Sequence, residues 1–457
     1  MMLRRRDALM TTLFGAGHIG LRALATGLPA WFLANPRRAT AQSLQCAIDA
    51  RANLQYLILS ASSNGDPLNC NCPGTYEQTG IIHPQQAEVA ATPVQLGSKT
   101  YNAALPWAST AAGGALAPAT LARTSFFHHV TRSTVHGDQP KVMKLLGATS
   151  GGEMLVSAYA KHLAGCFMTV QNEPIAVGAR GNSSELVSFA GRMLPSISPT
   201  QLKQLLTGSK TDPLVKVRSL RDTSLDQLNA IAKRDGNNVQ KAFLDSLATS
   251  QTQVRELADQ LSTTLNAITA DDAKGQALAA AALIAANVTS VVTVHLAFGG
   301  DNHSDQNLQA EADQHVSGVQ GIQAIMDALA SLQLTDKVTF ATLNVFGRNL
   351  NGIAKVTSRT GRDHYGNHAV TVMIGKNVAP SVIGGVTASS SGAYVASDID
   401  SATGNSLASG GDVPAAQTHV AAARTLGVAL GIPESQVAGD FTASAGGKVV
   451  KAALTGV

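Results

Sequence analysis

Four apolar runs, each leading into a polar loop, constrain the fold more than any other feature of this chain. The runs are rich in Val, Ile, Leu and aromatic residues and cover 54–60, 291–298, 338–346 and 369–374. Several are almost continuously apolar, which is typical of central strands that helices cover on both faces. The sequence therefore predicts an α/β fold with a mostly parallel sheet between two layers of helices.

A block with mostly helical signals, about residues 195–286, follows the first of these runs. Ser198 before Pro199 has the order of an N-cap followed by a proline at the first helical position. Apolar residues also recur every three or four positions, which defines one helix face; they are Val254, Leu257, Leu261, Leu265 and Ile268. We interpret the block as a helical insertion in one large domain that spans 42–457.

The stretch from Ala277 to Phe298 approaches membrane-spanning length. Polar residues interrupt it, and its composition changes midway from Ala and Leu to Val and Thr. We interpret it as a buried helix that runs into a buried strand, and we expect no transmembrane segment in the mature chain.

After Gly384 the chain becomes rich in Gly, Ser and Ala over 387–411, before a last helix near 415–430. This composition is typical of a loop. Two alternatives stay open for it: a lid, or a disordered surface loop.

The first residues have the pattern of an export signal. Three arginines, Arg4–Arg6, precede an apolar run, and a small-residue end lies at 39–41. We exclude 1–41 from the fold and expect export by the twin-arginine route to the periplasm or the cell exterior. That route carries folded proteins, often with a metal in place, and so mildly favours a metalloprotein.

The basic charge of the chain lies mostly in this signal. The formal net charge is +4, but six arginines and one aspartate fall within 1–41 and leave the mature part close to neutral. The sequence therefore gives no electrostatic support for nucleic-acid binding.

The four cysteines are Cys46, Cys70, Cys72 and Cys166. An oxidising compartment permits two disulfides among them. Cys70 and Cys72 also look like part of a metal site, but the chain has no second close pair. Disulfides or free structural thiols are therefore the favoured interpretation.

Asp301 and His303 follow directly on the run 291–298. Open α/β sheets hold their ligands just beyond the C-terminal ends of strands, because the strand ends leave a crevice there. A carboxylate and an imidazole together suit zinc, manganese or iron better than calcium. Taken alone, this triplet is better explained by a solvated turn.

Three more potential ligands, Asp363, His364 and His368, lie within six residues, directly before the run 369–374. The side chains of adjacent Asp363 and His364 point in different directions, so the pair can bind two metal ions. His368 can then complete the coordination of the nearer ion. Asp66, which follows the run 54–60, is a further carboxylate, with a simple Asp-Pro turn as the alternative. The clusters together predict a divalent-metal centre at one edge of the sheet.

The C-terminal half of the chain carries five motifs in order: Asp301-x-His303, Phe346–Arg348, Gly361-x-Asp363-His364, Asn367-His368 and Gly384-Gly385. These motifs are similar to those of the twin-arginine-exported domain-of-unknown-function family 1501, within the alkaline phosphatase-like superfamily. The resemblance covers most of the mature chain in order. It implies an alkaline phosphatase-like core.

The resemblance implies that Asp301, His303 and His368 bind one metal ion. It implies that Asp66, Asp363 and His364 bind a second one. Zinc is the expected metal, with manganese or calcium as alternatives.

In the superfamily a serine, threonine or modified cysteine attacks the ester while bridging the metals. Ser133 and Thr134 lie before a helical pattern at 142–146, the right neighbourhood for a nucleophile at a helix N-terminus. A polar helix-capping loop is the alternative for both residues. His136, in the same loop, is a candidate for a further ligand or a proton donor.

The expected reaction is hydrolysis of a small phosphate or sulfate ester between two cations about 4 Å apart. Arg348 or Arg362 is expected to clamp the oxyanion, with pairing to nearby acids as the alternative. Two other functions stay open. One is an exported binding or assembly protein that keeps the metal fold without turnover, and the other is a hydrolase with one metal and a bound water.

Overall fold

The structure is a computed structural model that describes residues 53–456, except 168, 170, 179–186, 195, 208–217, 239, 242–243, 246–247, 249–260, 352–359 and 443–445. The expected signal peptide at 1–41 lies outside the described residues. So do Cys46 and the first part of the helical pattern that begins at Val254.

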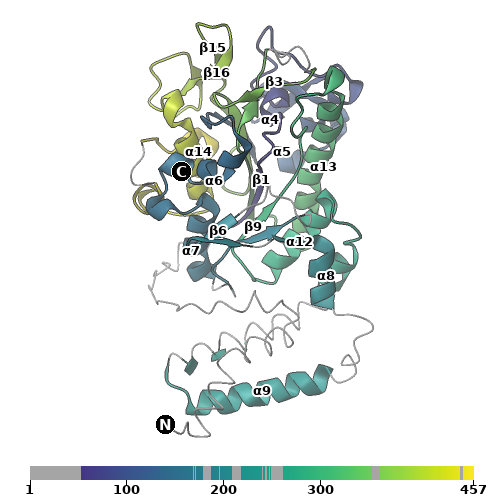
Figure 1. The fold of residues 1–457 in the computed structure, drawn as a ribbon, viewed down its shortest axis with the longest axis vertical. Helices are drawn as coiled ribbons and strands as arrows, with labels where there is room; N and C mark the ends of the chain where they lie inside the picture. Colours follow the sequence, from purple (N-terminus) through teal and green to yellow (C-terminus); the bar gives the residue numbers. More distant parts are fainter. Residues whose placement is uncertain are drawn as a thin grey trace.

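A central sheet of eight strands organises the chain (Figure 1). In spatial order the strands are β14 (Ser381–Ile383), β4 (Thr124–His129), β13 (Ala369–Ile374), β10 (Val338–Asn344), β1 (Tyr56–Ser62), β9 (Val291–Val294), β5 (Ile175–Val177) and β8 (Ser196–Ile197). Within this sheet β13 alone runs against its neighbours, β4 and β10, and the other strands share one direction. The sheet is mixed and mostly parallel, which confirms the predicted α/β fold class.

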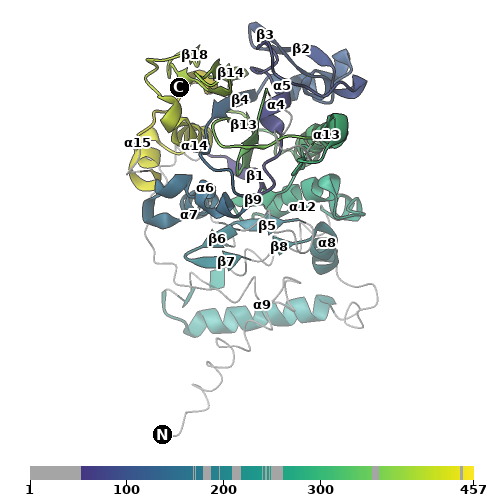
Figure 2. The ribbon, with the colours of Figure 1, turned by 45° about the horizontal axis from the view of Figure 1, so that its top comes forward.

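Helices cover both faces of the sheet (Figures 1 and 2). Helices α12 (Ala273–Ala285) and α13 (Gln309–Ser331) lie on one face, and α7 (Leu155–Phe167) and α14 (Thr418–Ala429) on the other. Because successive side chains of a strand point to opposite faces, β1 contributes to both layers. Its Ile58 packs in one hydrophobic core and its Leu57 and Leu59 in the other. This two-sided burial explains why apolar residues predominate in most strands of the sheet, although four of the six residues of β4 are polar.

The remaining helices and strand pairs complete the described part of the fold. The helices are α4 (Leu68–Asn71), α5 (Pro118–Leu121), α6 (Gln139–Met143), α8 (Pro199–Thr207), α9 (Arg218–Asp235), α11 (Ser262–Asn266) and α15 (Glu434–Gln436). The two-stranded pairs are β2 (Ala91–Leu96) with β3 (Lys99–Ala104), β6 (Val187–Phe189) with β7 (Arg192–Leu194), β11 (Gly347–Arg348) with β12 (His364–Tyr365), β15 (Val386–Ala388) with β16 (Tyr394–Ala396), and β17 (Asp398–Ile399) with β18 (Ser406–Leu407).

All four apolar runs form strands of the central sheet, as predicted: β1, β9, β10 and β13. The stretch 277–298 is a helix, α12, that leads into strand β9, which also agrees with the prediction. Among the described residues, no helix combines the length and the apolar character needed to cross a membrane.

The helical block contains α8, α9, α11 and α12, together with the short strand β8. Helix α8 begins as predicted, because Ser198 Oγ accepts the backbone N–H of Gln201 (3.3 Å). Helix α9 lies away from the sheet (Figure 1), whereas α12 packs against β9 and α13. The division into a core domain and an insertion stays a prediction.

The Gly/Ser/Ala-rich stretch after Gly384 forms the hairpins β15–β16 and β17–β18. It leads to α14, the predicted last helix. Of the cysteines, Cys70 and Cys72 are buried free thiols, and Cys166 is disulfide-bonded.

The polar loops of interest leave the sheet at one edge. Strands β1 and β10 are parallel and end level with each other, since Ser62 pairs with Asn344. The loops that follow β1, β4, β9 and β10 therefore begin at the same edge. Because β13 runs in the opposite direction, the segment 361–368 that precedes it lies at this edge too.

A buried histidine on α13 makes folding stability depend on pH. The Nε2 atom of His315 accepts a hydrogen bond from Trp107 Nε1 (2.8 Å), so the ring is neutral. Burial lowers the pKa of His315 to about 3. An exposed histidine in the unfolded chain has a pKa of about 6.5.

We expect the free energy of unfolding to fall as the pH drops from 7 to 5. In this range the unfolded chain takes up a proton at His315 that the folded chain does not, at a cost of about 2 kcal/mol at pH 5. His315→Gln keeps an acceptor for Trp107 and removes this titration, so its stability should fall less steeply. Urea unfolding at a series of pH values measures both slopes, and equal slopes would contradict the assignment.

Candidate metal centre

Backbone hydrogen bonds fasten the loop after β9 to the segment before β12. The N–H of Gly361 donates to the His303 carbonyl (3.0 Å), and that of Arg362 donates to the Asn302 carbonyl (3.1 Å). A Cβ on Gly361 would lie 1.6 Å from the Asn302 carbonyl oxygen, so only glycine allows this approach. The predicted meeting of the two loops at one edge is confirmed.

A buried carboxylate, that of Glu311 on α13, holds both segments against the helix. Arg362 donates to it through Nε (2.7 Å) and Nη2 (3.0 Å). The side-chain amides of Asn302 and Asn71 each donate to it at 2.7 Å. These hydrogen bonds replace the water that the carboxylate loses on burial, and they tie α4, α13 and both loop segments together.

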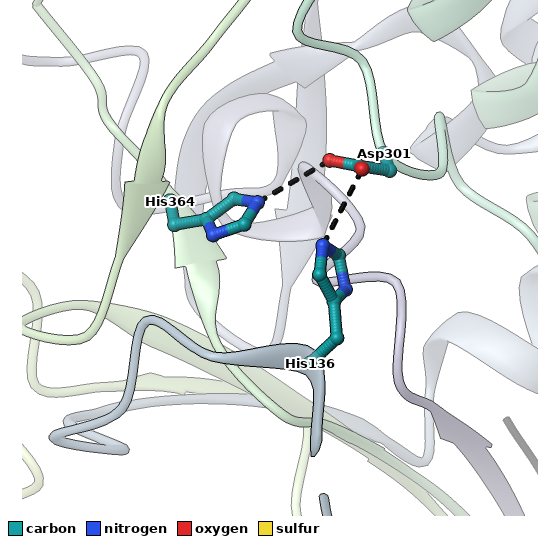
Figure 3. Close-up of side chains that lie close together, drawn as sticks. All are labelled: His136, Asp301 and His364. Atoms are coloured by element: carbon teal, nitrogen blue, oxygen red, sulfur yellow. Dashed lines mark hydrogen bonds and ion pairs between the residues drawn. The ribbon is translucent and has the colours of Figure 1, made fainter. Parts of the chain in front are cut away.

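Three side chains from three separate segments of the chain converge at this edge (Figure 3). Asp301 Oδ2 lies 3.3 Å from His136 Nε2, and Asp301 Oδ1 lies 3.3 Å from His364 Nε2. One ligand atom from each residue lies within 4.8 Å of the other two, so this group can hold a metal ion. His136 comes from the loop after β4, Asp301 from the loop after β9, and His364 from β12.

His303 adjoins this group. Its Nε2 lies 3.3 Å from Asp301 Oδ1 and 2.7 Å from His364 Nε2. Its Nδ1 lies 3.7 Å from the Asp363 carboxylate. The structure thus brings together four of the six predicted metal ligands, Asp301, His303, Asp363 and His364, and adds His136.

Backbone carbonyls orient two of the imidazoles. His136 Nδ1 lies 2.6 Å from the Ser63 carbonyl, and His364 Nδ1 lies 2.7 Å from the Thr134 carbonyl. Since a carbonyl only accepts, both Nδ1 atoms carry the proton. The Nε2 atoms of both rings therefore face Asp301, which is how metal-ligating histidines are commonly fixed.

The donor set fits a zinc ion. Imidazole nitrogens with one carboxylate are typical zinc ligands, and arms of about 2.0 Å in a tetrahedron separate the donor atoms by about 3.3 Å. The nitrogens of His136, His303 and His364 each lie 3.3 Å from an Asp301 oxygen. The shorter contact between His303 and His364 is a hydrogen bond through a proton on His303 Nε2, so a cation bound there would displace that proton.

Arg348 holds the carboxylate of Asp301 in place. Its Nη2 donates to Asp301 Oδ1 (2.7 Å), while Nε and Nη2 also donate to the carbonyls of Gly65 and Asn64. Burial raises the pKa of Asp301, but the hydrogen bond and charge of Arg348 outweigh it and leave the pKa below its ordinary value. Burial lowers the pKa of His364, so at neutral pH both groups are in the states that bind a cation.

Asp66 lies outside the converging group. It is fully buried, and its Oδ1 accepts the backbone N–H groups of Phe298 (3.0 Å) and Gly300 (2.8 Å). These bonds shape the turn that leads to Asp301. The assignment of Asp66 as a metal ligand stays a prediction.

His368 lies in a buried hydrogen-bond chain below the site. His128 Nε2 donates to the Pro73 carbonyl (2.9 Å), so its Nδ1 accepts from His368 Nε2 (2.9 Å). His368 Nδ1 accepts in turn from the Asn69 amide (3.2 Å). Both nitrogens of His368 are thus engaged away from the converging group, and its role as a ligand stays a prediction.

Asn69 connects this hydrogen-bond chain to Arg348, the residue that holds the Asp301 carboxylate. Its side chain donates to the Arg348 carbonyl and accepts from the Arg348 N–H, both at 2.9 Å. The buried histidines therefore fix the backbone of the arginine that positions Asp301.

The predicted nucleophiles have other partners in this structure. The hydroxyl of Ser133 is buried and donates to Asp138 Oδ2 (2.8 Å), while it accepts the Val135 N–H (3.2 Å). Thr134 contributes its carbonyl to His364, and its side chain is exposed. The arrangement matches the loop-capping alternative for Ser133.

Arg362 has the structural partners that were the alternative to oxyanion binding. Its guanidinium is buried against Glu311 and also donates to the carbonyls of Ile82 and Asn349. Sequence reasoning missed Glu311, Asn69 and His128. Of these residues, His128 alone gave a signal, as a histidine that directly follows two phenylalanines, Phe126 and Phe127.

Comparison with known families and proteins gives one match. A family model described as "Protein of unknown function (DUF1501)" matches residues 142–403, more than half of the chain. Among curated proteins, no match is found.

Replacing Glu311 should destabilise the fold strongly. Glu311→Gln leaves the Arg362 guanidinium buried without its counter-charge, and breaking such a pair costs about 3–5 kcal/mol. The matched control is Asp336→Asn, which breaks the exposed ion pair with Arg123 and should cost less than about 1 kcal/mol. Urea unfolding measures both, and similar losses in the two variants would contradict the role of Glu311.

Metal binding should distinguish Asp301 from Asp66. We expect the chain to bind a single zinc ion and Asp301→Asn to weaken that binding at least about tenfold, because the substitution removes a charged ligand. Asp66→Asn keeps an oxygen for the N–H groups of Phe298 and Gly300 and should retain the ion. Zinc titration with elemental analysis tests this. Two ions per chain, one of them lost in Asp66→Asn, would favour the two-metal assignment instead.

Proposed function

Since the chain belongs to the family described as "Protein of unknown function (DUF1501)", we propose its function from the site itself. The protein is an exported metal-dependent hydrolase that acts on phosphate or sulfate esters. The observation that carries the proposal is the convergence of His136, Asp301 and His364, with both imidazoles oriented by backbone carbonyls.

The side chains of the site are held in position to bind a cation, and the site remains accessible to a ligand from solvent. His136 and Asp301 expose 38% and 42% of their side chains, whereas Arg348 behind them is fully buried. The exposed side can receive an ester, and the buried side keeps the donors in position. A divalent cation held by these residues supplies a Lewis acid and lowers the pKa of a nearby water.

The geometry favours one cation and attack by water. The described residues gather donors for one ion, and Asp66 and His368, needed for the two-metal scheme, have other partners. The Ser133 hydroxyl is committed to Asp138. In this mechanism His136, His303 and His364 offer Nε2 atoms to the cation, and Arg348 keeps Asp301 ionised.

The ester class rests on the resemblance of the C-terminal motifs to the alkaline phosphatase-like superfamily. Export rests on the arginine-rich start of the chain. The disulfide at Cys166 supports export as well, because disulfides persist in oxidising compartments.

A binding or assembly role without turnover is the second candidate. The burial of both predicted oxyanion clamps, Arg348 and Arg362, favours it, since neither guanidinium can reach a ligand without giving up protein partners. A chain that binds the cation in full but lacks turnover would support this role.

Hydrolysis of 4-nitrophenyl phosphate and 4-nitrophenyl sulfate, with zinc, manganese or calcium added, tests the proposal. We expect turnover that falls at least about a hundredfold in Asp301→Asn and in His364→Ala, because each removes a cation ligand. The control Asp327→Asn changes an exposed carboxylate on α13 and should leave the rate unchanged.

Two further variants separate the mechanisms. Ser133→Ala and Thr134→Ala should retain activity if water attacks. Loss of activity in either variant, with its zinc content unchanged, would instead support attack by a protein nucleophile. Activity that survives both Asp301→Asn and His364→Ala would defeat the enzyme proposal.

A further inference from the structure

The Gly384-Gly385 pair belongs to the motifs of the family resemblance but has no part in the metal centre. It lines a groove of about 310 Å³, within the size range of small-molecule sites. The polar residues of this groove are Glu77, Gln78, Lys99, Tyr101, Asn405 and Ser406. Figure 2 shows the strands that carry its walls, β3 on one side and β14 and β18 on the other.

Glycines give the β14–β18 wall its shape. Gly384 and Gly404 have φ values of +69° and +74°, which side chains rarely adopt. The Gly384 N–H donates to the Gly404 carbonyl (2.8 Å) and holds the turn before β18 against the end of β14. A Cβ on Gly404 would lie 2.5 Å from Ile383, so the turn packs closely against the sheet. The groove is therefore a feature of a fixed backbone.

The groove presents both donors and acceptors, with its charges balanced. Lys99 Nζ on one wall donates to Asn405 Oδ1 on the other (3.3 Å). Glu77 Oε1 accepts the Asn102 N–H (2.9 Å), and its other oxygen has no hydrogen-bond partner among the described residues. A ligand here meets one carboxylate and one ammonium group together with neutral amides and a hydroxyl.

Tyr101 adds an aromatic surface. The ring is half-buried and packs against the hydrophobic core. Burial, together with the charge of Glu77, raises the pKa of Tyr101, so the phenol stays protonated. The side chain combines an apolar ring with a polar tip.

We propose that this groove binds a neutral saccharide. A sugar ring has hydroxyls around its edge, which the carboxylate and amide groups can pair, and C–H groups on its faces, which suit the Tyr101 ring. An anionic ligand would meet the carboxylate of Glu77, and a cationic ligand would meet the ammonium group of Lys99. An apolar ligand would leave the polar walls without partners, which is costly. The inference does not depend on the proposed hydrolase activity.

Calorimetric titration of the full chain with maltotriose, cellotriose and chitotriose tests the proposal. At least one sugar should bind, and Tyr101→Ala and Glu77→Gln should each weaken its binding about tenfold. Tyr101→Phe keeps the ring and should lose less than Tyr101→Ala. The matched control is Glu88→Gln, which changes an exposed carboxylate outside the groove and should have no effect.

The controls separate this inference from the hydrolase proposal. Asp301→Asn should bind the sugar with unchanged affinity, because the metal centre and the groove share none of the residues named for either. Circular dichroism checks the fold of Tyr101→Ala, and Glu77→Gln alters an exposed side chain. Absence of saturable binding for all three sugars, or equal affinity in wild type, Tyr101→Ala and Glu77→Gln, would overturn the proposal. Binding of inorganic sulfate that disappears in Lys99→Ala would overturn it too.

Discussion

The buried carboxylate of Glu311 is the constraint on which the rest of the site depends. A charge removed from water is tolerated only with close partners, and here the partners come from Asn71, Asn302 and Arg362. Asn302 lies between Asp301 and His303, and Arg362 is two residues before His364. The positions of the candidate metal ligands Asp301, His303 and His364 therefore depend on the hydrogen bonds around Glu311, a residue outside the group that would bind the cation.

Much of the fold could be predicted, because four strands of the sheet, β1, β9, β10 and β13, are mostly apolar. The location of the site could be predicted too, since the loops after parallel strands leave at one edge. Asp301 and His364 converge for this reason, and His136 joins them from the loop after β4. Strand β4 was missed because four of its six residues are polar. Strands β5, β8 and β14 were missed because two or three residues are too few for a recognisable pattern.

The details of the site depend on side-chain directions that sequence patterns do not contain. His368 directly precedes β13, and its ring faces His128 in the sheet instead of the cluster. Asp66 looks like a ligand in the sequence, yet its oxygen accepts two backbone N–H groups of the neighbouring loop. Glu311 has no sequence signal, because an acid near a helix start is usually at the surface. Each case is decided by a partner that lies far away along the chain.

The reversed direction of β13 has a consequence for how this protein matures. This strand lies between β4 and β10, and its insertion closes the gap between the segment that carries His136 and the segments that carry the other donors. Contacts over such long stretches of chain are slow to form, because closing a long loop costs conformational entropy. A cation that needs all these donors would bind only after the chain has been made as far as β13 and this strand has joined the sheet. A bound cation would then indicate that the sheet has formed, which is compatible with the proposed export of the protein in its folded state.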